Sequence, residues 1–361
     1  MEICNPSYAD LQELLKLVND TFRKDFYPSM EIEFPLLFSK DNLENLLIIK
    51  ENGKIVSHFG SLPQELIILG NFIPVGCIGS VCTHPNYRGK GYASILLKEI
   101  ERRLKHKKIP LMLISGTRAL YTRGGSKKVG RLFVYELESI PMREDVDVKE
   151  EIDWDNLKDI YQTERTRYFR SQIFWSTIIK SFNTLAKLQE RNFKLAHRLK
   201  IYTVLKNNIS LGYFLTSIED NEEITIEEYA GSRYFIFNAL ALLSQDKKII
   251  LPIPSWDKEL LIFLKDYTPS EVREMPWHHT WKIIDEDCLF SSIIKYIKER
   301  VDKFDYEKVE DGVNIKIGRD MYNIKKEDLP EFVLGGLERK WEGDWKKVFP
   351  LPLPLPGFNY I

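Results

Sequence analysis

Arg88-Gly89-Lys90-Gly91-Tyr92-Ala93 is the stretch of this sequence that decides the fold. It follows a β-branched, apolar run that ends at Thr83, and it leads into an amphipathic helical segment that continues to about Lys105. The two glycines have no Cβ, so the backbone there can adopt positive φ and approach a ligand closely. The amides and the dipole at the start of the helix favour an anion. The stretch therefore predicts a phosphate-binding loop between a strand and a helix.

The segments around the loop have the pattern of an α/β domain. Apolar residues have helical spacing in some segments and form strand-like runs in others, and Asn-Gly and Gly-Asn turns join the strands before the loop into hairpins. The predicted elements are a helix at 10–22, strands at 46–50, 55–60, 64–69 and 72–82, a helix at 92–105, a strand at 110–115, a short helix at 118–123 and a strand at 132–137. This order predicts a mixed sheet with helices, which we place at residues 1–142.

A similar order returns after the polar connector at 143–155, which suggests a duplicated fold. The predicted elements are helices at 154–169 and 172–188, strands at 201–205, 211–217 and 223–229, a helix at 234–243, a strand at 248–253 and a helix at 256–264. The turn in the place of the loop, residues 230–234, keeps one glycine and has the bulky Tyr234 where the main chain would approach a phosphate. We therefore expect residues 150–286 to be a degenerate second copy that binds no cofactor.

Residues 287–361 form a third predicted region. A helix at 293–304, a strand at 314–317 and an acidic helical stretch at 328–337 indicate a small α/β unit. The chain ends in Phe-Pro-Leu-Pro-Leu-Pro-Leu-Pro-Gly-Phe-Asn-Tyr-Ile, where alternating prolines exclude a helix and favour a stiff, extended backbone. Because leucines and aromatics fill this tail, we expect it to lie against the protein.

The composition is that of a soluble globular protein and argues against several function classes. Of the 361 residues, 43% are hydrophobic and 29% are charged, and the net charge is −1, so no bulk field attracts nucleic acid or a membrane. No apolar run approaches the ~20 residues of a membrane-spanning helix, and no signal peptide is visible. Cys4, Cys77, Cys82 and Cys288 lack metal-ligand spacing. We expect a reduced, cytoplasmic protein; a homo-oligomer is compatible with the sequence, which does not decide the oligomeric state.

Three kinds of phosphate-binding loop compete for the glycine stretch. A dinucleotide-binding fold needs the loop after the first strand of a parallel βαβ unit, whereas here it follows four strands with antiparallel turns. A nucleoside-triphosphatase loop needs Gly-Lys-Ser/Thr, which Gly91-Tyr92-Ala93 does not supply. The stretch resembles instead the signature Arg/Gln-x-x-Gly-x-Gly/Ala of the GNAT N-acetyltransferase superfamily, and residues 81–85 resemble the strand end that leads into it. The resemblance implies an enzyme with a mixed α/β fold that uses acetyl-coenzyme A (acetyl-CoA).

The resemblance also implies where the acetyl donor binds. The loop would hold the pyrophosphate, and the pantetheine arm would lie between the strands at 78–82 and 111–115. A main-chain amide near Val81 would polarise the thioester carbonyl. The implied CoA-binding residues are Val81, Cys82, Thr83, Arg88, Gly89, Lys90, Gly91, Tyr92 and Ala93. No metal is implied.

In this family the acetyl group passes directly to an amine, and a tyrosine protonates the departing thiolate. Leu120-Tyr121 and Gly125 match the family pattern Leu-Tyr-x-x-x-Gly-aromatic, except that Ser126 replaces the aromatic residue. The resemblance therefore implies that Tyr121 is the general acid. The alternative is a tyrosine that only packs in the core.

The base that deprotonates the acceptor amine is left open between several groups. The order of the three regions resembles the Eis-like (enhanced intracellular survival) acetyltransferases, which have an active domain, a degenerate copy and a sterol-carrier-like C-terminal domain. In that family the terminal carboxylate of the chain serves as base, which implies this role for Ile361, although the third region here is shorter. Glu33 and His84 are rivals; the alternatives are a solvated loop carboxylate for Glu33 and a turn residue for His84.

The acceptor and the class of function are also left open. The acceptor is an amine of a small molecule or of a peptide, and a non-catalytic acyl-CoA sensor or a protein-interaction module on the same scaffold is the alternative function. The pair His278-His279 invites a metal interpretation. Adjacent side chains on a strand point in opposite directions and no third ligand lies near in the sequence, so we expect structural packing.

Overall fold

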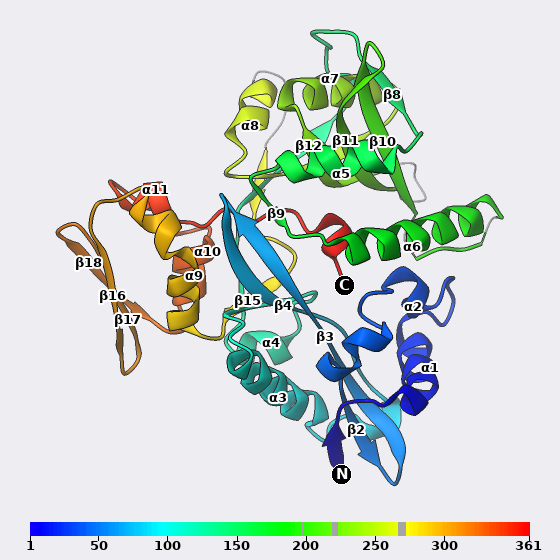
Figure 1. Cartoon of the computed structure of the whole chain (residues 1–361), viewed down its shortest axis with the longest axis vertical. Helices are drawn as coiled ribbons and strands as arrows, with labels where there is room; N and C mark the ends of the chain where they lie inside the picture. The colour runs from blue at the N-terminus through cyan, green and yellow to red at the C-terminus, as the bar shows by residue number, and fades with distance from the viewer. Residues whose placement is uncertain (192, 197, 219–222, 266–271) are drawn as a thin grey trace.

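The computed structural model describes residues 1–191, 193–196, 198–218, 223–265 and 272–361. Within these residues the chain forms three β-sheets with helices around them, and the end of the chain lies at the centre of the molecule, between the first two sheets (Figure 1). The expected α/β class is therefore confirmed. Among the helices of these ranges, none combines the length and the apolar character that crossing a bilayer requires.

The first sheet is built from the predicted meander. In spatial order it contains β1 (Glu2–Cys4), β2 (Leu47–Glu51), β3 (Lys54–Ile68), β4 (Asn71–Thr83), β5 (Leu111–Ile114), β15 (Thr280–Ile283) and β6 (Lys127–Lys128), with β9 (Thr166–Tyr168) paired to β3. All neighbours in this order are antiparallel except β4 and β5, which are parallel. Its helices are α1 (Leu11–Phe22), α2 (Met30–Glu33), α3 (Tyr92–His106) and α4 (Ala119–Arg123), and short 3-10 turns are η1 (Tyr8–Asp10), η2 (Lys40–Asn45) and η3 (Pro85–Tyr87).

The prediction of two separate strands at 55–60 and 64–69 is wrong, because β3 runs through Pro63 without a break. Proline has no N–H to donate, so it fits a strand only where one side has no partner. Here β2 pairs with β3 only as far as Phe59, and β9 begins to pair at Leu66. Pro63 lies in the interval between them.

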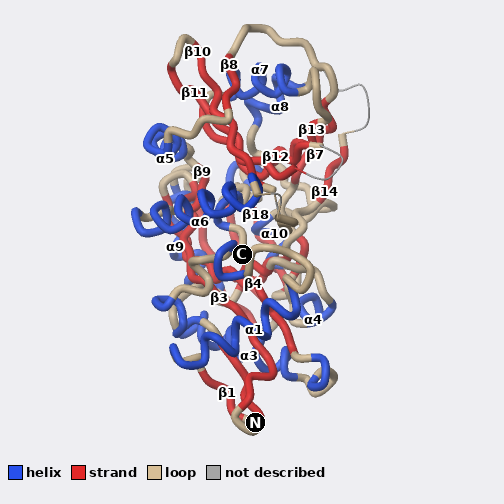
Figure 2. The backbone as a smooth tube through the Cα atoms, turned by 90° about the vertical axis from the view of Figure 1, so that its right-hand side faces the viewer, coloured by secondary structure: helices blue, strands red, loops and turns tan. Residues whose placement is uncertain are grey.

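The second sheet repeats this plan. In spatial order it contains β14 (Arg273–Met275), β7 (Leu132–Leu137), β13 (Ile249–Pro254), β12 (Ile224–Gly231), β11 (Ile209–Ile218), β10 (Leu199–Lys206) and β8 (Asp147–Lys149). The parallel pair is now β12 and β13. The helices are α5 (Trp154–Thr163), α6 (Gln172–Glu190), α7 (Arg233–Leu243) and α8 (Lys258–Leu264) (Figure 2). The predicted helix at 154–169 ends early: Tyr161 Oη bonds the main chain of Tyr168, and that segment joins the first sheet as β9.

The two sheets exchange their last strands. β7 follows the first copy in the sequence but pairs with β13, whereas β15 follows the second copy but pairs with β5. In each sheet the strand from the other half lies antiparallel to the second strand of the parallel pair. The predicted boundaries at 142 and 286 thus leave each exchanged strand on the other side of the boundary from its sheet.

The third region contains β16 (Phe304–Val309), β17 (Gly312–Ile317) and β18 (Asp320–Lys325), with α9 (Glu286–Lys298), α10 (Leu329–Leu334) and α11 (Trp345–Val348). The predicted helix at 293–304 is displaced. It begins at Glu286 because Asp285 caps it by accepting from the amide of Cys288, and Phe304 opens β16 instead.

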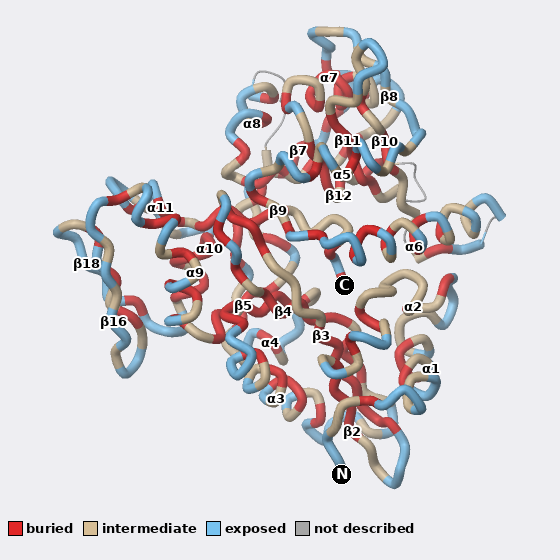
Figure 3. The backbone as a smooth tube through the Cα atoms, viewed as in Figure 1, coloured by how far each residue is buried: buried red, intermediate tan, exposed pale blue. Residues whose placement is uncertain are grey.

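Buried residues are concentrated in the sheets and in the helices that cover them (Figure 3), and most of these residues are apolar. One face of the first sheet packs against α3, and the other face shares a continuous core with α1, the third region and the tail. Leu351 and Leu353 of the tail are 2% exposed, so the expectation that the tail lies against the protein is confirmed. A last 3-10 turn, η4 (Gly357–Asn359), brings the chain to its end at Ile361.

Candidate active site

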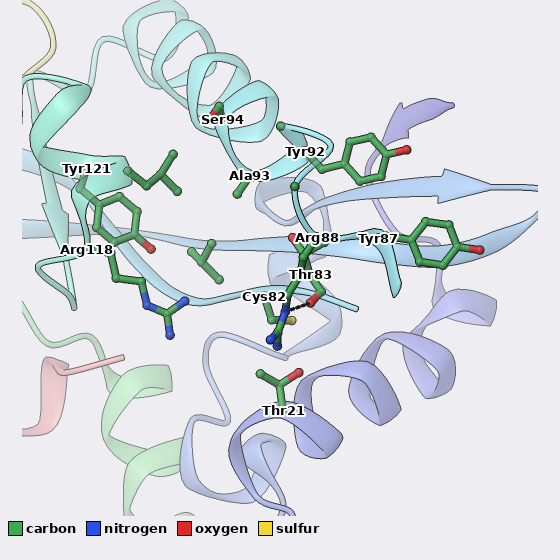
Figure 4. A pocket seen from close by; sticks show the side chains of 14 residues that line it. Thr21, Cys82, Thr83, Tyr87, Arg88, Tyr92, Ala93, Ser94, Arg118 and Tyr121 are labelled. Atoms are coloured by element: carbon green, nitrogen blue, oxygen red, sulfur yellow. Dashed lines mark hydrogen bonds between the residues drawn. The ribbon is translucent and has the colours of Figure 1, made fainter. Parts of the chain in front are cut away.

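The glycine loop forms one wall of a cavity of about 630 Å³, here called the loop cavity (Figure 4). The end of β4, the segment before and within α4, and Thr21 of α1 form the other walls. Of the nine residues predicted to bind CoA, all line this cavity except Lys90. The Lys90 ammonium lies 3.3 Å from a Glu51 carboxylate oxygen and 4.8 Å from the centre of the Tyr87 ring.

Both glycines of the loop have a backbone that disfavours other residues. Gly89 has φ of +81° and Gly91 has φ of +78°. A Cβ built on either would meet no atom within 4 Å, so the glycines are required by the backbone angle and not by a neighbouring side chain. The space beside both main-chain segments is open to a ligand.

The amides of the loop and of the first turn of α3 are oriented for an anion. Gly91 is the N-cap of α3, so the next amides have no acceptor in a preceding turn. Among the turn, loop and cap hydrogen bonds of the described ranges, none is donated by the amides of residues 89–94. The helix dipole adds a partial positive charge at the same place. These main-chain donors fit a diphosphate such as that of coenzyme A.

Arg88 holds the start of the loop against the end of β4. Its Nε donates a 3.2 Å hydrogen bond to the carbonyl oxygen of Thr83, while the side chain remains exposed at the cavity wall (Figure 4). The arginine therefore fixes the turn between strand and helix, and it places a positive charge beside the open amides.

β4 separates from β5 next to this cavity. The parallel pairing ends at Ile78 and Ile114, where the amide and hydroxyl of Ser115 both bond the carbonyl of Ile78. A β-bulge lies immediately beyond, because Ser80 and Val81 together oppose Phe59 of β3, and Ser80 has φ of +54°. The bulge bends the strand and re-aims the amides near Val81. No pattern in the sequence predicts this bulge.

Tyr121 lies on the wall of the loop cavity, with Arg118 beside it (Figure 4). Its side chain is 4% exposed, and a Cβ added to Gly116 would lie 3.3 Å from the ring. Burial raises the pKa of the phenol, and the Arg118 guanidinium opposes that effect. The hydroxyl therefore stays protonated at neutral pH and can donate a proton.

A second cavity of about 190 Å³, here called the tail cavity, adjoins the first and shares Val81, Arg118 and Tyr121 with it. The tail closes it with Tyr360 and Ile361. A Cβ on Gly79 would lie 2.7 Å from the carbonyl carbon of Ile361, so only glycine leaves room for the end of the tail. The structure thus brings Ile361 and Tyr121, predicted from opposite parts of the sequence, to one place.

Glu33 is placed differently. Its carboxylate is ion-paired with Arg23, whose Nε donates at 2.8 Å, and both side chains are largely buried. Glu33 lines a third cavity of about 330 Å³, here called the α6 cavity, and does not line the tail cavity. Because Glu33 is paired with Arg23 and lies outside the tail cavity, the geometry argues against Glu33 as the base.

The α6 cavity lies between α2, α6, β11 and the tail. Apolar and aromatic side chains supply most of its wall, and the polar groups are Glu33, Glu227, two serines and the two histidines. The Ser217 hydroxyl donates to Glu227. Phe34 and Tyr360 line both this cavity and the tail cavity, so the two adjoin at the end of the tail.

The histidines and cysteines have structural surroundings. Burial lowers the pKa of His279 to about 4, and its ring lies 5.5 Å from that of Tyr360. His84 accepts from the amide of Asn86 at 3.3 Å and does not line the loop cavity. Burial raises the pKa of Cys82 to about 12, so its thiol stays protonated. Over the described ranges, no group of three or more His, Cys, Asp or Glu side chains could hold a metal ion.

The corresponding loop of the second copy already holds an anion from the protein itself. The amide of Gly231 donates to a Glu164 carboxylate oxygen at 2.9 Å, and Arg233 pairs with the same carboxylate at 2.7 Å. Arg233 also bonds Asp257 at 2.8 Å. These partners occupy the place that a phosphate would need, which gives a physical reason for the expectation that this copy binds no CoA.

Sequence reasoning missed Arg118, Ser80 and Glu227, which the structure places on the cavity walls. Arg118 is the first residue of the predicted short helix and the N-cap of α4 in the structure, and its charge close to Tyr121 in the sequence was the one signal available. Ser80 and Glu227 are brought to the site by a bulge and by the second sheet, and neither feature has a local sequence pattern.

Comparison with known proteins agrees with this geometry. The family model described as "Acetyltransferase (GNAT) domain" matches residues 2–126. No curated protein matches the chain. Among solved structures, Eis1 from Mycobacterium abscessus is similar at a TM-score of 0.64 and 14% identity, over 98% of each chain. A GCN5-related N-acetyltransferase from Anabaena variabilis has a TM-score of 0.59 and 17% identity, over 90% of this chain and 86% of that one. A probable N-acyltransferase from Enterococcus faecalis has a TM-score of 0.59 and 16% identity, over 81% and 74%.

Residues 2–126 therefore match a GNAT acetyltransferase domain, and the chain has a fold similar to that of Eis1. Both parts of the resemblance seen in the sequence are confirmed. The domain match and the fold support acyl transfer from an acyl-CoA donor as the general activity. The roles of individual residues stay predictions.

Proposed function

We propose that the protein is an acetyl-CoA-dependent N-acetyltransferase that moves the acetyl group directly to a primary amine. The observation that supports this most is the meeting of the loop cavity and the tail cavity at Val81, Arg118 and Tyr121. A donor held in the first cavity and an acceptor held in the second would meet over Val81. No covalent enzyme intermediate is needed, and the buried thiol of Cys82, with its pKa raised to about 12, is unsuited to form one.

The donor would be held by main-chain groups. The open amides of residues 89–93 bind the pyrophosphate, and Arg88 adds positive charge. The pantetheine arm enters where β4 leaves β5, and an amide near Val81 in the bulge donates to the thioester oxygen as negative charge develops there. Acetyl-CoA supplies the activated acetyl group.

Two proton transfers of the reaction would involve Ile361 and Tyr121, which both line the tail cavity. The terminal carboxylate of Ile361 accepts a proton from the ammonium form of the acceptor, whose neutral nitrogen then bonds the carbonyl carbon and loses its second proton to solvent. As the carbon–sulfur bond breaks, the Tyr121 hydroxyl gives its proton to the thiolate. The products are an amide and free CoA, and the tyrosine is reprotonated by solvent.

The walls of the α6 cavity favour a small-molecule amine as the acceptor. Its volume of about 330 Å³ and its enclosure by α6 and the tail suit a compact molecule better than the lysine of a folded protein. The aromatic wall suits an apolar body, and Glu227 suits a second cationic or hydrogen-bonding group. The amine to be acetylated would project past Phe34 and Tyr360 into the tail cavity.

Release of free thiol from acetyl-CoA in the presence of a panel of small amines tests this function. The wild type should release CoA with at least one amine and form the matching amide, which mass spectrometry identifies. Tyr121→Phe should lower kcat about 10²-fold or more while the affinity for CoA, measured by calorimetry, stays within twofold. Tyr135→Phe is the matched control, because Tyr135 is equally buried but lies on β7 in the second sheet.

The opposite results would contradict the proposal. CoA binding without thiol release across the panel, together with an unchanged Tyr121→Phe protein, would indicate the non-catalytic acyl-CoA sensor. Absence of any CoA binding would exclude both functions.

A further inference from the structure

The tail reaches the tail cavity over a buried ion pair of the second region. Arg170, between β9 and α6, and Glu228 of β12 have side chains that are 1% and 4% exposed, and Nη1 of Arg170 donates to Glu228 at 2.9 Å. The Tyr213 hydroxyl donates to the same carboxylate at 2.6 Å. The pair is therefore fully enclosed and hydrogen-bonded.

Asn359 of the tail connects this pair to the first sheet. Its Oδ1 accepts from Nε of Arg170 at 2.8 Å, and its Nδ2 donates to Oε1 of Gln64 on β3 at 2.6 Å. Gln64 in turn donates from Nε2 to the carbonyl oxygen of Asn359 at 3.1 Å. Both ends of the Asn359 side chain and its carbonyl are thus fixed, two residues before Ile361.

The two residues before Asn359 are fixed by the same pair. Gly357 has φ of +47°, and a Cβ there would lie 1.9 Å from Oε2 of Glu228, so the main chain lies directly on the carboxylate. The Phe358 ring lies 5.4 Å from the Arg170 guanidinium and packs among the rings of Trp154, Trp175 and Phe182. Side chains from both sheets therefore hold the end of the tail. The contacts of Arg170, Glu228 and Gln64 with residues 357–359 are here called the seat of the tail.

A gain in stability does not explain why the charged pair of Arg170 and Glu228 lies under the tail. A buried ion pair is often no more stabilising than apolar side chains of the same volume, because both ions lose their hydration. What charged, directional donors add is orientation: they define where Asn359 lies and which way its carbonyl points. Reacting groups have to be placed within about 0.5 Å of their productive positions.

We propose that Arg170, Glu228 and Gln64 are positioning residues that orient the last residues of the tail, so that Ile361 faces the reacting amine. The inference rests on the proposed function, in which the Ile361 carboxylate accepts the proton. It assigns a part in the reaction to the second region, whose own glycine loop is filled by Glu164.

Two substitutions break the seat from different sides and leave the loop cavity untouched. Asn359→Leu removes both side-chain hydrogen bonds of the tail, and Gln64→Met removes the contacts from β3. Each should lower kcat 10- to 100-fold, because a displacement of about 1 Å costs up to that much, while CoA affinity stays within twofold. Asn323→Leu, which breaks an asparagine pair on the third sheet, is the control and should leave kcat unchanged.

The pH profile separates positioning from loss of structure. In the wild type, kcat should level off above the pKa of the base. In both variants it should continue to rise with pH, since only amine that is already neutral can react. Should Asn359→Leu fail to fold, Gln64→Met carries the same test, because it changes no residue of the tail.

Adding one glycine after Ile361 moves the terminal carboxylate. It therefore tests the proposed base separately from the proposed positioning residues. If the extended protein loses activity and both seat variants keep wild-type kcat and pH profile, the positioning role is overturned and the proposed function stands. If the extended protein is as active as the wild type, the carboxylate is not the base, and the proposed function fails at that step. Loss of activity in all three, with the altered pH profile in the seat variants, supports the inference.

Discussion

The main-chain carbonyl carbon of Ile361 lies against Gly79, at a distance that leaves no room for a side chain on that residue. Gly79 is the residue at which β4 has just left β5, and it directly precedes the bulge at Ser80 and Val81. The last residue of the chain and the strand that carries the proposed carbonyl-binding amide are therefore in contact.

Gly79→Ala should push the main chain of Ile361 away from β4. A Cβ there would come within 2.7 Å of Ile361, so the tail must move, and kcat should fall at least tenfold with CoA affinity unchanged. Gly76→Ala is the control on the same strand, because the atoms nearest to its Cβ would belong to the side chain of Leu104 and not to the tail. Steady-state kinetics of both variants measures the difference; equal activities would contradict a role of the tail in the reaction.

Gly89→Ala and Gly91→Ala should weaken CoA binding. Both positions have positive φ, which costs an alanine roughly 1 kcal/mol, and a shift of the loop would turn its amides away from the pyrophosphate. We expect the dissociation constant for CoA to rise five- to tenfold or more in calorimetry. Gly53→Ala imposes the same strain at φ of +77° in the β2–β3 turn, also with open space around it, and should leave CoA binding unchanged.

Acidification should destabilise the first region through His58. Burial lowers the pKa of His58 from 6.5 to about 4, and the ring is fully enclosed, with Nδ1 3.2 Å from the carbonyl of Leu47. The unfolded chain takes up a proton near pH 6.5 and the folded one only near pH 4, so stability is present above pH 6.5 and is lost as the pH falls to 4. The loss from this residue is ~3 kcal/mol.

Urea unfolding between pH 7 and 4 measures this effect. His58→Gln should show a lower stability at pH 7 but a shallower decline with acid. His106→Gln, at an exposed position on α3, should follow the wild type. Identical slopes for all three proteins would show that His58 is not the group responsible.

The filled loop of the second copy predicts one CoA per chain. Calorimetric titration should give a stoichiometry of one, and a second equivalent would contradict the account of Glu164 as an internal anion. Glu164→Ala leaves Arg233 largely buried with one carboxylate fewer and should lower the free energy of unfolding by about 3 kcal/mol. Glu150→Ala, which breaks an exposed pair with Lys200, should change it by less than about 1 kcal/mol.

The loop and most elements of the first region were predictable because their causes are local. Positive φ at Gly89 and Gly91, the amphipathic spacing of α3 and the Asn-Gly turn before β3 are all written in short stretches of sequence. The position of Tyr121 followed from a family pattern, and the structure places it on the same cavity as the loop.

Other features depend on contacts between distant residues and leave no local pattern. The bulge at Ser80 requires the register of β3 against β4, and the ion pair of Glu33 with Arg23 requires α2 to return to the end of α1. Asn359 and Gln64 are 295 positions apart. Leu132–Leu137 reads as a strand in either sheet, so periodicity alone could not decide which one it joins.

The crossing of β7 and β15 between the sheets makes the two halves of the protein dependent on each other. A fragment that stopped near residue 142 would carry β7 without a partner and would leave the edge of β5 bare, which invites aggregation. A fragment that began after residue 142 would carry β15 without its partner β5 and would leave the edge of β13 bare. The halves should therefore be recovered in folded form only when they are expressed together, and neither copy could have been lost or replaced alone once the crossing was established.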